Sequence, residues 1–106
     1  MEFNDYQQQI NNFANFNQQL GPYITGLNIV SAVGKLSENL VDVLNKQNGA
    51  LDKKDIAKIE ISLGDIMQWI STTATTIGID LDEIGMMNIR KTYLIHQQQI
   101  TNESQT

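Results

Sequence analysis

The chain has 106 residues, no cysteine and a formal net charge of -5, which comes from seven basic and twelve acidic side chains. The length suits one domain with a single core, and the lack of cysteine excludes disulfides, thiolate metal sites and thiol nucleophiles. The acidic balance argues against broad capture of nucleic acid, and no segment approaches the roughly 18 apolar residues of a membrane span, so we expect a cytoplasmic protein with neither nucleic-acid nor membrane partners.

Helical periodicity runs through most of the chain, and Gly and Pro residues interrupt it. The first helix is predicted over residues 5–19, with Asp5 as its N-cap. Gly21 and Pro22 are expected to end it, and a longer second helix follows over residues 23–47. The Asn48–Gly49 pair after that helix predicts a left-handed stop.

Two acidic pairs predict where the remaining helices begin. Asp52 and Asp55 form a variant of the capping box at the start of the third helix, which is predicted to run to Gly78. Asp80 and Glu83 form a second box at the start of the fourth helix.

Short links between the helices, with no strand pattern to compete, predict one all-α domain over residues 1–96. The expected architecture is a four-helix bundle whose two long central helices pack antiparallel. Residues 97–106 are expected to form a frayed polar tail.

Two short motifs place polar side chains in the otherwise apolar central helices. Lys35 and Glu38 stand three residues apart in the second helix, and Ser62 and Asp65 do so in the third. Residues three apart share one face of a helix. Polar groups repeated on two facing helices indicate a site held between them, provided that the helical register brings the motifs together.

Four further segments follow one another along the chain: residues 3–7 (FNDYQ), 63–66 (LGDI), 78–84 (GIDLDEI) and 88–91 (NIRK). In order and spacing they resemble helices of the MazG-like family of all-α nucleotide pyrophosphohydrolases, over nearly the whole chain from Phe3 to about Tyr93. The resemblance implies a MazG-like bundle that binds a nucleotide and forms dimers or tetramers through its long helices.

In that family the second helix carries Glu-x-x-Glu and the third Glu-x-x-Asp. The four carboxylates hold Mg²⁺ ions on a nucleoside triphosphate, which water cleaves between the α and β phosphates. Matched motif to motif, Glu38 and Asp65 keep the acidic, metal-binding identity, whereas Lys35 and Ser62 replace the other two carboxylates. The formal charge of the set is then -1 in place of -4.

This replacement changes what the site can bind. A lysine ammonium about 4 Å from Mg²⁺ is repelled by roughly 8 kcal/mol at an effective dielectric of about 20. Lys35 and a metal ion therefore compete for the same space. An ammonium can, however, bind phosphate oxygens directly.

Three interpretations follow. In the first, the protein holds a nucleotide or a nucleotide-derived signal without a cofactor, and hydrolysis is lost or weakened. Lys35 then contacts phosphate, and the resemblance implies that Asn88 and Lys91 reach in from the fourth helix. In the second, a Mg²⁺-dependent pyrophosphohydrolase persists on Glu38 and Asp65.

In the third interpretation the chain is a protein-interaction module. Lys35, Glu38 and Asp65 then form a satisfied salt-bridge cluster that needs no ligand.

Trp69 lies one turn beyond Asp65 on the same helix face, where it could stack on a base or pack in a core or interface. Two long apolar helices in so short a chain leave part of a stripe uncovered, which favours a homo-oligomer. The interface candidates are Ile66, Ile70, Ile77 and Met87. The compact, amide-rich composition suits a small bacterial or phage protein.

Overall fold

The computed structural model describes residues 1–13, 21–46 and 48–104. These residues form four α-helices and no strand: α1 (Phe3–Phe13), α2 (Gly21–Leu44), α3 (Lys53–Thr76) and α4 (Leu81–Ser104). The prediction of an all-α chain with four helices is therefore confirmed over the described residues. Within these ranges, no helix is both long enough and apolar enough to cross a membrane.

The predicted capping groups lie at the starts of α3 and α4. The Asp52 carboxylate accepts a hydrogen bond from the Asp55 backbone N–H at 2.9 Å, and the Asp55 carboxylate accepts one from the Asp52 N–H at 3.1 Å. At α4 the Asp80 carboxylate accepts from the Glu83 N–H at 2.7 Å. These bonds satisfy amide groups that have no partner within a helix.

Glycine conformations mark where the helices change direction. Gly49 has φ 62° and Gly78 has φ 77°, as expected for residues that follow α2 and α3 in the left-handed region. Gly21 and Pro22 instead belong to the first turn of α2, where proline is well tolerated because its missing N–H would have no helical partner. The part of the first predicted helix over residues 14–19 lies outside the described residues.

The fourth helix is longer than its composition suggested. We expected a polar tail from residue 97, but α4 continues to Ser104. The Thr101 hydroxyl donates to the carbonyl of Gln97, and the Ser104 hydroxyl donates to that of Ile100, both at 3.0 Å. The amide-rich end of the chain is thus a helical arm.

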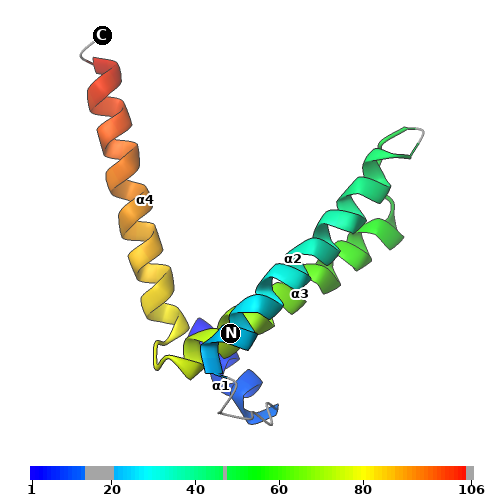
Figure 1. The fold of residues 1–106 in the computed structure, drawn as a ribbon. Helices are drawn as coiled ribbons and strands as arrows, with labels where there is room; N and C mark the ends of the chain where they lie inside the picture. The colour runs from blue at the N-terminus through cyan, green and yellow to red at the C-terminus, as the bar shows by residue number, and fades with distance from the viewer. Residues whose placement is uncertain (14–20, 47, 105–106) are drawn as a thin grey trace.

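The long helices α2 and α3 pack side by side and antiparallel, as predicted (Figure 1). α1 packs against α3, whereas α4 contacts chiefly α1 and then diverges from the α2–α3 pair (Figure 1). The radius of gyration is 17.8 Å, against about 13 Å for a compact domain of this length. Within one chain, therefore, the four helices do not surround a common core.

The α2–α3 contact is lined by small and polar side chains. Thr25, Ala32 and Val43 are the buried residues of α2, and Ser62 and Thr72 are among those of α3. Six large apolar side chains that recur at helical spacing along α2 are exposed. They are Leu27, Val30, Val33, Leu40, Val41 and Leu44.

Two side chains of α1 bind the junction between α3 and α4, and Gln7 makes most of the bonds. The Gln7 amide nitrogen donates to the Ile79 carbonyl at 2.9 Å and to the Thr75 hydroxyl at 3.1 Å. Its amide oxygen accepts from the Leu81 N–H at 2.9 Å, and the neighbouring Asn4 accepts from the Asp82 N–H at 3.1 Å. The direction in which α4 leaves the fold is therefore set by side chains near the N-terminus.

Candidate functional site

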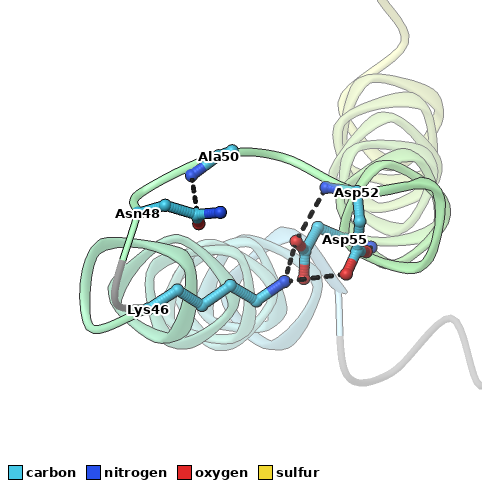
Figure 2. Close-up of polar contacts among 5 residues, drawn as sticks. All are labelled: Lys46, Asn48, Ala50, Asp52 and Asp55. Atoms are coloured by element: carbon cyan, nitrogen blue, oxygen red, sulfur yellow. Dashed lines mark hydrogen bonds and ion pairs between the residues drawn. The ribbon is translucent and has the colours of Figure 1, made fainter.

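The turn between α2 and α3 is closed by one lysine and two aspartates. The Lys46 ammonium lies 3.0 Å from the Asp52 carboxylate and also pairs with the Asp55 carboxylate (Figure 2). The backbone N–H of Asp55 and, secondly, the ammonium of Lys46 donate hydrogen bonds to the Asp52 carboxylate and lower its pKa from 3.8 to about 2. The pKa of Lys46 is raised, first by its bond to Asp55. These contacts place the end of α2 against the start of α3.

A second polar contact fixes the register one heptad further along both helices. The Asn39 side-chain nitrogen donates to the Ser62 hydroxyl at 2.7 Å, and Ser62 is only 2% exposed. Because the helices are antiparallel, this contact places the turn from Lys35 to Glu38 alongside the turn from Ser62 to Asp65. The two predicted motifs therefore lie level with each other in the hairpin.

Their side chains nevertheless point to different surroundings. Lys35, Glu38 and Asp65 are exposed, whereas Ser62 is buried and bonded to Asn39. The ion pairs given by the described residues join Lys46 to Asp52 and Asp55, so the expected cluster of Lys35, Glu38 and Asp65 does not form in this structure. Asn39 is the residue that the sequence interpretation missed, because an amide one position beyond Glu38 resembles an ordinary surface residue.

The surface of α2 beside the first motif is slightly hollowed. The lining residues are Gly34, Ser37, Glu38, Val41 and Asp42, and we refer to them as the α2 hollow. It is open to solvent and has two carboxylates on one side. Lys35 is not among its lining residues, so the cationic and anionic members of the first motif face different parts of the surface.

The charge of Asp65 acts on a tyrosine of α1. This negative charge contributes to a raised pKa of the Tyr6 phenol, although burial of the phenol is the larger cause. Burial and a nearby anion both disfavour the phenolate. Tyr6 also lines an apolar pocket, together with residues of α3 and α4: Phe3, Met67, Ile70, Leu81, Ile84 and Gly85.

The donor set does not fit the Mg²⁺ site that the resemblance implies. Mg²⁺ requires near-octahedral oxygen ligation, usually with one or two carboxylates that converge on the ion. Only Glu38 and Asp65 of the four family positions are carboxylates, both are exposed, and the Ser62 hydroxyl is already bonded to Asn39. Over the ranges that the structure describes, no three acidic or histidine side chains are grouped as metal ligands.

The remaining predicted residues are spread over two helices. Trp69 is half-buried on α3, and its backbone carbonyl accepts a bond from the Thr73 hydroxyl at 2.7 Å. Asn88 and Lys91 are exposed on α4, which diverges from α2 and α3 (Figure 1). A single chain therefore does not bring Asn88 and Lys91 to Lys35.

Comparison with known proteins gives no relative from which a role for these residues could be taken. The MazG-like resemblance accordingly depends on the short segments and their order along the chain. No protein-family model, no curated protein and no solved structure matches the chain.

Proposed function

We propose that the protein binds a nucleotide or a nucleotide-derived small molecule through its phosphates and does not hydrolyse it. The observation that supports this proposal most directly is Lys35. Its ammonium is exposed and forms no ion pair with any described residue, although the two motifs lie level in the hairpin. An unneutralised ammonium in this position can donate hydrogen bonds to the oxygens of a phosphate group.

The loss of hydrolysis follows from the neighbours of Lys35. Magnesium-assisted cleavage needs carboxylates that converge on the ion and on the substrate phosphates. Here one family carboxylate is replaced by a cation, and another by a hydroxyl that Asn39 already binds. Phosphate contacts are thus favoured while the metal chemistry that would cleave the phosphates is not.

The test is titration calorimetry of the full chain with nucleoside mono-, di- and triphosphates, in Mg²⁺ and in EDTA, alongside an assay for released pyrophosphate. We expect binding that survives EDTA and no pyrophosphate. Lys35→Gln should weaken binding about tenfold or more, because it removes a charge-assisted contact. Lys58→Gln is the matched control, since Lys58 is an exposed lysine on α3 that belongs to neither motif.

Two results would overturn the proposal. Mg²⁺-dependent release of pyrophosphate would make the protein an active pyrophosphohydrolase. Failure of every nucleotide to bind, by a chain that is folded and stable, would leave an interaction module instead. Equal weakening by Lys35→Gln and Lys58→Gln would show that bulk charge rather than this position attracts the ligand.

A further inference from the structure

The face of α2 that points away from α3 carries a second regular stripe. The stripe, which we call the outer seam, follows the alternating spacing of three and four residues that is typical of a coiled-coil contact. It contains no charged residue, and all of its members are exposed in the single chain. They are Leu27, Val30, Gly34, Ser37, Val41 and Leu44.

The outer seam is self-complementary when it is turned end to end. In both directions it presents a leucine, a valine, a small residue, another small residue, a valine and a leucine. Two antiparallel copies therefore match Leu27 with Leu44, Val30 with Val41, and Gly34 with Ser37 of the second copy. A surface that matches itself under a twofold rotation is what an isologous dimer requires.

Gly34 lies at the centre of this pattern, and no neighbouring atom of the chain requires a glycine there. A Cβ added to it would meet nothing within 4 Å. Glycine inside a helix costs about 1 kcal/mol relative to alanine, so an unused helical glycine needs an explanation. Close approach of a second helix at the crossing point provides one, and the α2 hollow lies at the same place.

The size of the apolar surface also suits a second copy. Tyr23, Val33 and Leu40 border the outer seam and are exposed as well. Covering these side chains and the seam in both copies removes roughly 1,500 Å² of surface, within the range of about 1,200–2,000 Å² that stable protein interfaces bury. We infer that two copies of this chain pair antiparallel through the outer seam of α2.

The lack of native cysteine allows a direct test of this pairing. Val30→Cys and Val41→Cys are made as separate single variants of the full chain and oxidised, alone and as an equimolar mixture. In the antiparallel pair Val30 faces Val41 of the second copy, so the mixture should give a disulfide-linked dimer that contains one of each. Neither variant alone should cross-link, because its two cysteines lie about 16 Å apart along the helix axis, beyond the reach of a disulfide.

Asp42→Cys serves as the matched control, since it is also exposed on α2 but lies off the outer seam. Mixed with Val30→Cys it should give little cross-linked dimer. Self-cross-linking of each valine variant would indicate parallel pairing and overturn the inference. A dimer in sedimentation without a link between residues 30 and 41 would place the interface elsewhere, for example on α4, and would overturn it too.

A second measurement does not depend on disulfide formation. Gly34→Leu should convert the dimer to monomer in sedimentation, because the bulk prevents close approach, whereas Gly64→Leu on α3 should leave the dimer intact. Both glycines have open space in the single chain. A Gly34→Leu chain that remains dimeric overturns the inference. Neither experiment uses a nucleotide, so a negative result counts against the dimer and not against the proposed nucleotide binding.

Discussion

Asn39 donates a hydrogen bond of 2.7 Å to the buried hydroxyl of Ser62, and this contact ties α2 to α3 at the level of the two sequence motifs. Ser71, on the same helix, is fully buried, and its hydroxyl has no partner among the described residues. Two buried serines on one helix thus have opposite hydrogen-bonding states. Their matched replacement separates the contribution of the bond from that of burial.

Ser62→Ala is expected to destabilise the fold by about 1 kcal/mol, because Asn39 loses its acceptor in a half-buried position. Ser71→Ala is expected to be neutral, or to stabilise the fold by about 1 kcal/mol, since it removes an unsatisfied buried hydroxyl. Urea unfolding of both variants measures the difference. Equal effects would mean that the Asn39–Ser62 bond contributes nothing to stability.

The contacts of Asp52 with Asp55 and Lys46 predict a loss of stability in acid. The pKa of Asp52 is lowered to about 2 in the folded chain, against an ordinary value of 3.8. A group with a depressed folded pKa stabilises the fold above its unfolded pKa, and that stabilisation is lost as the pH falls from about 4 towards 2. Thermal unfolding between pH 6 and 2 should show this loss in the native chain.

The matched variant for that experiment is Asp52→Asn, which should show a shallower decline over the same pH interval. Glu60→Gln is the control, because Glu60 is exposed on α3 and forms none of the described ion pairs. If Asp52→Asn and the native chain lose stability in parallel, Asp52 is not responsible for the acid sensitivity.

The proximity of Asp65 to Tyr6 can be measured from the titration of the phenol. The pKa of Tyr6 is raised by burial and, secondarily, by the Asp65 charge. Asp65→Asn should therefore lower the pKa of Tyr6 without restoring its ordinary value, because burial remains. Ultraviolet titration with Tyr6→Phe as the reference isolates this phenol from Tyr23 and Tyr93. An unchanged pKa would place Asp65 away from α1.

Gln7 is predicted to control the order of α4. Gln7→Ala removes three hydrogen bonds at the α3–α4 junction and is expected to destabilise the fold by about 1–3 kcal/mol. Amide hydrogen exchange at Leu81 should also accelerate, since that N–H loses its acceptor. Gln8→Ala, at an exposed neighbouring position, should do neither. Similar exchange in the two variants would contradict the fastening role of Gln7.

Local chemistry made the starts of α3 and α4 and the stop after α2 predictable. Asp52 and Asp55 form a capping box whatever the rest of the chain does, and Gly49 adopts a positive φ that few other residues tolerate. The end of α4 was not predictable in this way. A run of glutamines and polar residues has neither an apolar stripe nor a stop signal, although glutamine itself is a good helix former.

The site was harder to predict because it depends on which face of α2 meets α3. Leu27 and Val41 follow helical spacing but stay exposed, and the observed contact uses Thr25, Ala32 and Asn39 instead. Small and polar residues at the α2–α3 contact produce little hydrophobic periodicity. The motif spacing left the register of the two helices open. The Asn39–Ser62 bond sets it, bringing Lys35 and Glu38 level with Ser62 and Asp65, and it also occupies the Ser62 hydroxyl.

The start of the last helix depends on side chains of the first helix. α4 is the last element of the chain, but Asn4 and Gln7, among the earliest residues, cap its first turn. Proteolytic removal of residues 1–7 would therefore act on the distal arm, whose far end lies well away from the cut (Figure 1). A bulky fusion at the start of the chain would disturb the bonds of Asn4 and Gln7 to α4, whereas one added at the far end of α4 would not.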